Sequence, residues 1–570
     1  MKAIKKILVL MMAALLSFSV FSFAGCDEKG GFKIDKTKTQ IYVHSYSGGF
    51  GVEWMEALID RFEEDYKDYP GEDGKVGVQI VPDYQKTMGA GLLAAMSGNE
   101  NYVLFTEGVN YYDWVAQGAC LDLTEMLSEP LTEYGENKSI MDKMTPTMQE
   151  ALKVDTSAGE DRVYMVPHYA AYQGITLDID LMDDKQMFLG KDGKFKYKST
   201  DACTAGDTTG DSGKLSAGQD GKFGTYDDGL PATYEEFFEL IELLNGVSYP
   251  IAWSGQYQRY VTQMMGCMAA SAMGPQYAET LYTYNKTDFP VVKTSTIQTN
   301  SKDPWSLTYE TEKINITESN GYEVFRHPGF LTALAFVEAI VDGGYFKNSS
   351  FTGSILHTDI QDEFLQSRLD SASFDKPIAM LIEGCWWENE ASQSFKDLDD
   401  TYGNCGRMDR RLRFLPFPQI DEAHIGQGQV LLETNNAYGF INARTPEQYR
   451  QLSLDFLQYC CTDASLREYS RVTNTTKALK YELTAEDRAA MSYFGNSLMD
   501  IQEAEDTVIV YPMANNTTFK EKKTSLDVQD LWTLSAAVKT PTTYFKERMS
   551  TGDDAKTYFT SFYTHWKQGW

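Results

Sequence analysis

From residue 41 onward, short apolar runs alternate with apolar residues spaced three or four positions apart. The run 41–43 predicts a buried strand, the glycine-rich stretch 45–51 a turn, and the apolar positions from Met55 to Tyr66 an amphipathic helix. Residues 76–80 predict a second strand, 86–97 a helix and 102–105 a third strand. Because strands and helices follow one another in turn, the pattern predicts an α/β fold with a parallel sheet.

Two helix starts are marked by a threonine three residues before a glutamate or glutamine. Thr233 precedes Glu236, and Thr445 precedes Gln448. In a capping box these side chains satisfy free amide donors at a helix N-terminus, so we expect a helix to begin directly after each threonine. The stretch 190–230 is instead rich in Gly, Asp, Lys and Thr, which predicts an inserted loop.

The N-terminus has the three parts of an export signal. Lysines precede an apolar run from 7 to 24, and Ala24 and Gly25 stand before Cys26. This end resembles the bacterial lipobox, which implies removal of residues 1–25 and lipidation of Cys26. The polar stretch 26–39 predicts a flexible tether. A membrane-spanning helix is the alternative interpretation, since the apolar run nearly reaches the length needed.

Composition and charge narrow the function classes. The chain has 570 residues, 42% hydrophobic and 23% charged, which is ordinary for a globular protein and excludes a disordered or small disulfide-rich one. Acidic residues outnumber basic ones by 82 to 51, and the net charge of −31 argues against nucleic acid as a partner. Aromatic residues make up 13% of the chain, more than core packing needs. Tyr and Trp offer both a stacking face and a hydrogen bond.

Several segments, in order along nearly the whole mature chain, resemble bacterial extracellular solute-binding proteins of the sugar-transporter type, the family that includes maltose-binding protein. They are 41–51, 103–107, 118–124, 166–182, the helix after Thr233, 379–386, 414–418 and 438–462. The resemblance implies an α/β fold of the periplasmic-binding-protein type (type II), with a ligand cleft between two lobes. It places lobe 1 at 36–165 and 437–485, and lobe 2 at 166–436 and 486–570.

The resemblance also implies a mode of action. A carbohydrate would be captured by hinge closure and delivered to an ABC permease. Because the chain is long enough for a larger cleft, the expected carbohydrate is an oligosaccharide. The protein would be a monomer on the extracellular face of the cell membrane, held there by its lipid anchor alone. No nucleic acid is expected as a partner.

Sugars present apolar faces ringed by hydroxyls, so a cleft for them needs flat rings and polar side chains. Trp386 stands where the family has a stacking tryptophan, and a tryptophan packed in the core of lobe 2 is the alternative interpretation. Trp387 is a second candidate for stacking on the sugar. Because consecutive side chains of a strand face opposite sides, we expect at most one of the two tryptophans to reach the solute. Glu107 follows a strand end, and Tyr46 and Ser47 lie in the first βα loop, where open α/β sheets bind ligands.

The expected crossing between the lobes supplies further candidates. His168, Tyr169 and Tyr172 follow Pro167 there, and they either shape the cleft or pack the crossover. The resemblance places additional ligand contacts after the next predicted strand, at Trp253, Tyr257 and Arg259.

Glu383 and Glu388 flank the two tryptophans and leave an enzymatic alternative open. They would be the carboxylate pair of a surface glycoside hydrolase, although only their proximity in the sequence supports the pairing. Glu383 is equally a candidate for contacting the solute. The sequence contains no Gly-x-Ser-x-Gly elbow, His-Glu-x-x-His helix or phosphate loop. We therefore expect a binding protein that is not an enzyme; a structural lipoprotein that binds other surface proteins is a third hypothesis.

The inserted loop gathers aspartates among glycines, and hard oxygen ligands on flexible turns suit Ca²⁺. Its first part is similar to an EF-hand loop, but the glycine comes one position late and the final glutamate is missing. A solvated acidic loop is therefore the favoured interpretation. The tentative ligands are Asp207, Asp211, Asp220, Asp227 and Asp228. No other cofactor is expected.

Overall fold

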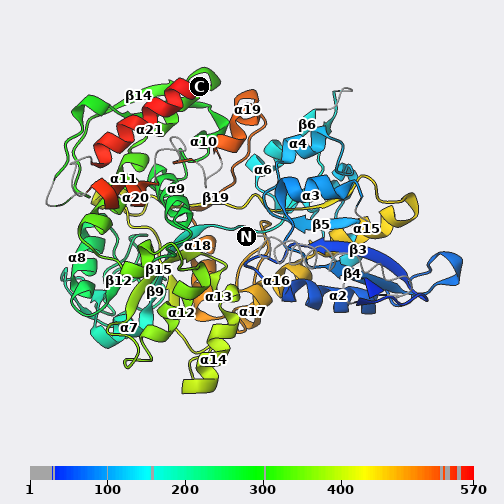
Figure 1. Cartoon of the computed structure of the whole chain (residues 1–570), viewed down its shortest axis with the longest axis horizontal. Coiled ribbons are helices and arrows are strands. Elements are labelled where there is room, and N and C mark those ends of the chain that lie inside the picture. The colour runs from blue at the N-terminus through cyan, green and yellow to red at the C-terminus, as the bar shows by residue number, and fades with distance from the viewer. Residues whose placement is uncertain are drawn as a thin grey trace, which may run out of the picture.

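The computed structural model describes residues 28–29, 32–98, 101–155, 159–300, 303, 305–526, 531–532, 540–548 and 554–570. The predicted export signal and Cys26 lie outside these residues. The described chain forms two α/β lobes side by side along the long axis of the molecule, with the C-terminal helices on the second lobe (Figure 1). The predicted α/β class and two-lobed architecture are confirmed.

The sheet of the first lobe begins with the strands predicted near the N-terminus. Strand β3 (Thr39–Ser45) pairs in parallel with β4 (Val78–Asp83) and β5 (Val103–Thr106). Strand β18 (Tyr438–Ile441) joins the sheet antiparallel to β5 and to β8 (Val166–Pro167). The order is β4, β3, β5, β18, β8, so the parallel pairing predicted from the local pattern is confirmed for the first three strands only.

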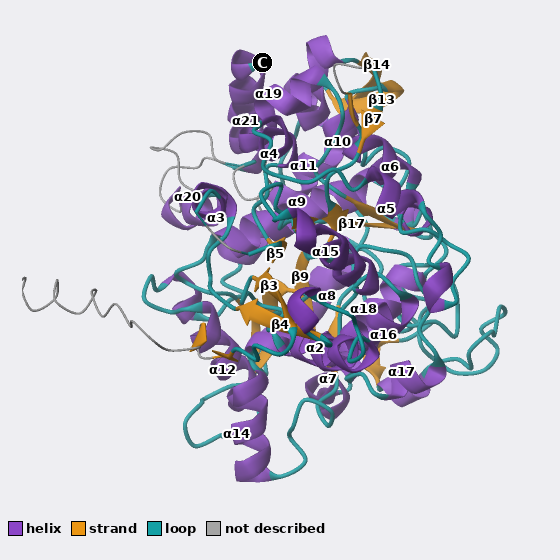
Figure 2. Cartoon of the chain, turned by 90° about the vertical axis from the view of Figure 1, so that its right-hand side faces the viewer, coloured by secondary structure: helices purple, strands orange, loops and turns teal. Residues whose placement is uncertain are grey.

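Helices cover both faces of this sheet. Helix α2 (Glu53–Asp65) buries Trp54, Met55, Leu58, Ile59 and Phe62, which confirms the predicted amphipathic helix. Helices α2 and α16 (Asp463–Thr473) lie on one side of the strands and α3 (Gly89–Met96) on the other (Figure 2). The remaining helices near this sheet are α4 (Tyr111–Ala116), α5 (Thr124–Ser128), α6 (Pro146–Leu152) and α15 (Glu447–Tyr459).

The second lobe has its own sheet, in the order β12, β15, β9, β16. Strand β12 (Tyr249–Ala252) is parallel to β15 (Ile378–Gly384), whereas β9 (Gln173–Asp178) runs antiparallel to β15 and to β16 (Leu412–Phe414). Every residue of β9 and β15 is buried, as expected of strands covered on both faces. A separate parallel pair joins β17 (Gln429–Leu432) to β19 (Thr507–Val510).

Helix α9 (Arg259–Met273) of the second lobe is buried on nearly all sides and packs against β9, β15 and β17. Helix α11 (Pro328–Asp342) packs against α9, and the C-terminal α20 (Pro541–Arg548) and α21 (Ala555–Gly569) pack against α11. The other helices of this part of the chain are α7 (Ile179–Lys185), α8 (Tyr234–Asn245), α10 (Thr280–Thr283), α12 (His357–Ser367), α13 (Trp387–Glu390), α14 (Ser392–Tyr402), α17 (Ala485–Ala489), α18 (Tyr493–Glu503) and α19 (Thr517–Leu526).

One helical stretch among the described residues, Glu318–Asp342, is long and apolar enough to cross a membrane. It includes α11, and 94% of its most apolar window is buried inside the protein. The apolar side chains of this stretch therefore pack in the core of the second lobe.

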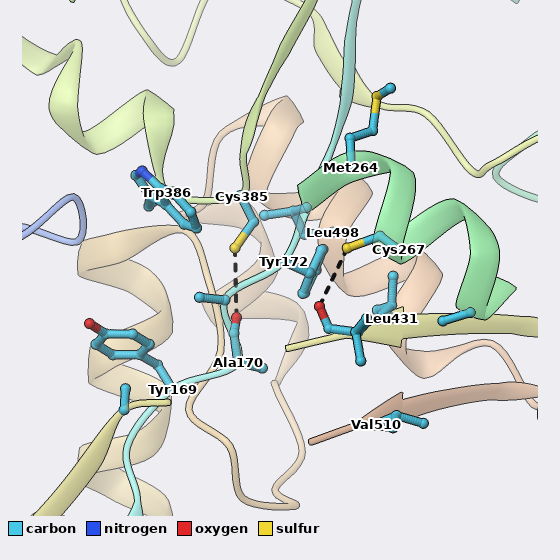
Figure 3. Close-up of a cluster of buried hydrophobic side chains, with 14 of the residues drawn as sticks. Tyr169, Ala170, Tyr172, Met264, Cys267, Cys385, Trp386, Leu431, Leu498 and Val510 are labelled. Carbon is cyan, nitrogen blue, oxygen red and sulfur yellow. Dashed lines mark hydrogen bonds between the residues drawn. The ribbon is translucent and has the colours of Figure 1, made fainter. Parts of the chain in front are cut away.

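Chain segments that cross between the sheets are hydrogen-bonded to one another. The first connects β8 to β9 and the second connects β17 to β18. The amide of Thr434 in the second crossing donates to the carbonyl of Ala171 in the first over 2.8 Å. A third passage, from α16 to α18, meets the first where Tyr169 pairs with Lys477. The crossings thus form one connected bundle between the lobes, part of which is drawn in Figure 3.

The two expected capping boxes differ in the structure. Thr233 accepts from the amide of Glu236, and the Glu236 carboxylate accepts from the amide of Thr233, as predicted. At the other site Pro446 is the N-cap of α15 and makes no side-chain cap. The hydroxyl of Thr445 is buried without a hydrogen-bond partner, so the second capping box was predicted wrongly. The helix begins one residue later than the spacing required.

This difference gives a matched pair of substitutions. We expect Thr233→Val to lower the free energy of unfolding by about 1 kcal/mol, because it removes a working N-cap. Thr445→Val replaces an unpartnered hydroxyl with a methyl group, so we expect a change of less than about 0.5 kcal/mol. Chemical denaturation of both variants checks this. Equal losses at the two positions would contradict it.

Candidate functional site

A cavity of about 400 Å³ opens between the lobes. Loops that follow β3, β4 and β5 form its walls on the first lobe, and loops that follow β12 and β15 form them on the second, with the first turns of α9 and α12. In open α/β sheets, the carboxyl ends of strands are where ligands bind. The lining residues are Tyr46, Ser47, Gly48, Gly49, Lys86, Met88, Glu107, Tyr257, Arg259, Tyr260, Gln263, His357, Thr358, Trp386, Glu390 and Asn435.

The first lobe contributes a tyrosine and a carboxylate held by the backbone around them. The amide of Tyr46 donates to the carbonyl of Phe105 over 3.0 Å, which ties the loop after β3 to β5. Glu107 Oε1 accepts from the Tyr169 hydroxyl and from Asn435 Nδ2, the latter over 3.2 Å. Both partners belong to crossing segments, so the Glu107 carboxylate lies on the side of the cavity nearest the crossings.

The second lobe contributes aromatic rings. The Trp386 ring meets Tyr260 edge-on, with centroids 6.4 Å apart. Tyr257 stacks on Tyr260 at 5.8 Å, and His357 meets Tyr257 edge-on at 5.3 Å. The guanidinium of Arg259 lies 5.3 Å from the Tyr257 ring centroid. These groups present flat apolar faces beside hydrogen-bond donors, the combination that a hydroxyl-rich guest requires.

The lobes touch where Gly49 meets Trp386. A Cβ added to Gly49 would lie 2.1 Å from Trp386 Cδ1, far inside van der Waals contact. Phe50 stands on the same side, its ring centroid 6.0 Å from that of Trp386. The contact therefore depends on the missing side chain of Gly49.

Burial sets the protonation of the first-lobe groups. It raises the pKa of Glu107, while hydrogen bonds from Tyr169 and Asn435 and the charge of Arg259 oppose the rise. Burial, followed by the charges of Glu107 and Glu390, raises the pKa of Tyr46 to about 12. Tyr46 therefore keeps its proton near neutral pH and can donate a hydrogen bond.

Two further carboxyl groups lie close together in the second lobe. Burial raises the pKa of Glu390 to about 7, and Glu107 adds to the rise. Glu383 is 1% exposed, and burial followed by the charge of Glu390 raises its pKa well above the ordinary value. Glu383 was predicted to contact solute, but it does not belong to the lining of the cavity, and it shares the Gln361 amide with Glu390.

The crossing residues divide between the cavity and the core. Tyr169 reaches the cavity wall through its hydrogen bond to Glu107. His168 instead packs beside Trp54, with ring centroids 5.0 Å apart, and its Nδ1 accepts from Lys477 Nζ over 2.5 Å. Burial lowers the pKa of His168 well below its usual value. Of the two interpretations of His168, the structure favours packing of the crossover.

Three other predicted contacts also lie in the core. Tyr172 is buried, and its hydroxyl accepts from Gln502 Nε2 over 2.7 Å. Trp253 is 1% exposed and packs on Phe346 and Phe351. Trp387 is fully buried among rings of the second lobe, namely Phe364, Phe395 and Phe494. In each case the local chain turns the side chain into the lobe and away from the cavity.

The hypothetical carboxylate pair of a hydrolase is not arranged around the cavity. Glu388 is 1% exposed and accepts from the Ser492 hydroxyl over 2.7 Å. Neither Glu388 nor Glu383 belongs to the residues that line the cavity. The geometry gives this pair no place to meet a glycosidic bond.

The aspartates of the insert are engaged with its own backbone and hydroxyls. Asp207 accepts from the amides of Thr209 and Ser212, and Asp211 accepts from the Thr209 hydroxyl. Asp227 accepts from the amide of Asp220, and Asp228 from that of Gly224. Within the described residues, no group of three or more metal-ligating side chains occurs. These carboxylates hold the turns of the insert together.

Several lining residues were missed by the sequence reasoning. The inner face of α9 carries Tyr260 and Gln263 as well as the predicted Arg259. Their spacing along the chain would have indicated a shared helix face if a helix had been predicted to begin at Arg259. Glu390 lies four residues after Trp386, but the strand pattern around 380 hid the short helix α13. Lys86 and Asn435 come from loops and His357 from the start of α12, and their positions depend on the packing of both lobes.

Comparison with solved structures gives the fold its place among known proteins. The chain is similar to the solute-binding protein (SBP) RafE in complex with raffinose, at 14% identity and a TM-score of 0.50, over 93% of this chain and 99% of that one. It is also similar to a chitin oligosaccharide binding protein, at 12% identity and a TM-score of 0.52, over 93% and 98% of the two chains. This chain has the two-lobed solute-binding protein fold. No family model and no curated protein matches its sequence.

The apo-form of RafE from Streptococcus pneumoniae is similar as well, at 13% identity and a TM-score of 0.50, over 94% of this chain and 99% of that one. In this solute-binding protein fold the cavity described above lies between the lobes. The fold is thus settled across nearly the whole chain.

Proposed function

We propose that this protein binds a carbohydrate between its lobes and delivers it to an ABC permease, without altering the bonds of the carbohydrate. The observation that supports the proposal most is the composition of the inter-lobe cavity. Its lining combines the rings of Trp386, Tyr257 and Tyr260 with the polar groups of Glu107 and Asn435. Rings pack against the apolar faces of a sugar, and carboxylate and amide groups bond its hydroxyls.

Two of the similar structures support a carbohydrate as the solute. One similar structure contains raffinose and another is a chitin oligosaccharide binding protein. The cavity volume of about 400 Å³ lies within the usual range of small-molecule sites. We propose an oligosaccharide as the solute, held by Tyr46, Ser47, Glu107, Tyr169, Tyr257, Arg259 and Trp386.

The remaining parts of the proposal concern organisation and location. The predicted lobe 1 was 36–165 and 437–485, and lobe 2 was 166–436 and 486–570, but β8 (Val166–Pro167) pairs with β18 in the first sheet. We propose these lobes with β8 added to lobe 1, so that the crossings act as the hinge. We further propose that residues 1–25 are removed and that a lipid on Cys26 holds a monomer at the extracellular face of the membrane. The lipobox resemblance supports this, and metabolic labelling with a fatty acid in the presence and absence of a Cys26→Ser substitution tests it.

The decisive experiment is titration of a carbohydrate panel by isothermal calorimetry, with analysis of the recovered sugar. The panel includes monosaccharides, raffinose and chitin oligosaccharides. We expect saturable binding of at least one oligosaccharide, with a dissociation constant on the order of micromolar, and recovery of intact sugar. Cleavage products would indicate a hydrolase, and no binding by any carbohydrate would overturn the proposal.

A further inference from the structure

A buried amide lies between two carboxyl groups beneath the floor of the cavity. Gln361 Nε2, on α12, donates to Glu383 Oε1 over 3.2 Å and to Glu390 Oε2 over 3.0 Å. Gln361 is 1% exposed, and its Oε1 is buried without a hydrogen-bond partner. A neutral amide thus lies against two acids and keeps a free acceptor of its own.

Glu383 has little to compensate a negative charge. Its carboxyl group accepts from Gln361 Nε2 and from the amide of Gly384, the latter at Oε2 over 3.1 Å. A carboxylate buried beside a second carboxylate, with neutral donors only, favours the protonated form. These contacts therefore favour the protonated form of Glu383.

Glu390 differs because it reaches the cavity. Its side chain is 19% exposed and lines the wall beside Trp386. His357 Nε2 stands 3.8 Å from Glu390 Oε1, but burial, Lys86 and Arg259 lower the pKa of His357 and keep it neutral near pH 7. The other titratable groups that face Glu390 or line the same cavity are Lys86, Glu107, Glu383, Tyr46, Tyr257, Tyr260 and Arg259.

We propose that Gln361 and the protonated Glu383 position Glu390 as a solute-binding carboxylate, and that solute binding releases a proton from Glu390. The inference rests on the proposed function. Hydroxyl groups of a bound sugar donate to an ionised carboxylate in hydrogen bonds about twice as strong as neutral ones. The sugar therefore binds best when Glu390 is charged, and Gln361 supports that charge by donating to it. In this scheme Gln361 and Glu383 are positioning residues.

The scheme fixes the sign of the pH dependence. Because the pKa of Glu390 is about 7 without solute, half of the molecules carry the proton at that pH. Acidification then competes with solute, and we expect affinity to be about tenfold weaker at pH 6 than at pH 8. Calorimetry at pH 7 in buffers of different ionisation enthalpy should report release of roughly half a proton per bound sugar.

Substitutions test whether Gln361 and Glu383 act on binding through Glu390 or only stabilise the fold. Glu390→Gln should give a Kd that no longer changes between pH 6 and pH 8 and no proton release. Gln361→Met removes the hydrogen-bond donor to Glu390, so the midpoint of the change in Kd with pH should rise. At pH 7 the variant should bind several-fold more weakly than wild type, and its Kd should recover toward the wild-type value at higher pH. Glu383→Gln should leave the profile unchanged, because Glu383 already holds a proton. Gln366→Met makes the same substitution on the same helix, five residues after Gln361, and is the matched control.

A second measurement needs no solute. An acid whose pKa is raised by folding stabilises the protein below its unfolded pKa, and this stability is lost as pH rises through the folded pKa. Relative to wild type, the Tm of Glu383→Gln should therefore increase as pH rises from 5 to 8. A difference in Tm that is constant with pH would overturn the protonated Glu383.

The outcomes distinguish this inference from the proposed function. A sugar that binds with the same affinity at pH 6 and pH 8, or a Glu390→Gln variant that keeps the wild-type profile, overturns the inference and leaves the function standing. If no carbohydrate binds at any pH, the function fails and proton-linked capture fails with it. In that case the pH dependence of Tm, measured without sugar for wild type and Glu383→Gln, still decides whether Glu383 is protonated.

Discussion

Replacing Trp386 with alanine is expected to weaken carbohydrate binding by about 2 kcal/mol, roughly thirtyfold in Kd. Trp386 is the largest ring in the wall of the cavity, and it also forms the contact between the lobes at Gly49. Its removal takes away the face against which a sugar ring would pack. Because Trp386 is only 6% exposed and packs on Tyr260 and Phe50, we also expect its removal to lower Tm. Calorimetry and thermal denaturation of the purified variant measure the two effects.

Trp387 supplies the control for this experiment. It is the next residue in the chain but lies in the core, where it packs on Phe364, Phe395 and Phe494. We expect Trp387→Phe to lower the free energy of unfolding by about 1 to 2 kcal/mol while Kd stays within about twofold of wild type. If Trp386→Ala bound sugar as tightly as wild type, Trp386 would only pack the lobes together and the proposed site would be misplaced.

The second large effect is expected from Gly49→Ala. The added Cβ would stand 2.1 Å from Trp386 Cδ1 and 2.6 Å from Cγ, atoms close to the Trp386 backbone that cannot move aside easily. The lobes would then have to separate, so we expect Kd to weaken by about tenfold or more. Small-angle scattering at saturating sugar should show a larger radius of gyration than wild type. Calorimetry gives the loss of affinity.

A glycine in open space provides the comparison. A Cβ on Gly98, in the same lobe, would meet nothing within 4 Å, so Gly98→Ala should leave both Kd and the radius of gyration unchanged. An unchanged Kd for Gly49→Ala would show that the contact between Gly49 and Trp386 is not needed in the sugar-bound state. Loss of affinity in both variants would point to a general effect of glycine replacement.

The local pattern of apolar residues was sufficient to predict individual elements. Apolar spacing identified α2, short apolar runs identified β3 and β5, and alternation identified β4, because each of these signals can be seen in a single segment. The capping box at Thr233 was predictable for the same reason, since all its partners lie within four residues. The capping box at Thr445 failed because Pro446 occupies the N-cap, a backbone choice that spacing alone does not reveal.

Some site residues could be chosen from the sequence. Tyr46, Ser47 and Glu107 follow strands directly, and Trp386 follows β15, so their positions at strand ends could be expected. Whether they bind solute remains a prediction. The sequence could not tell Trp386 from Trp387, because both are large rings after one strand and only the turn into α13 sends one to the cavity and the other to the core.

By itself, the sequence determined the α/β class, the succession of early strands and helices, and the acidic and aromatic character of the protein, all of which depend on neighbours in the chain. Only the tertiary structure decided that β18 enters the first sheet antiparallel, that His168 and Trp253 pack inside, and that Glu390, Lys86 and Asn435 face the same cavity. The physical reason is distance along the chain. A cavity built by two lobes brings together groups hundreds of residues apart, and their burial and pKa values depend on that packing.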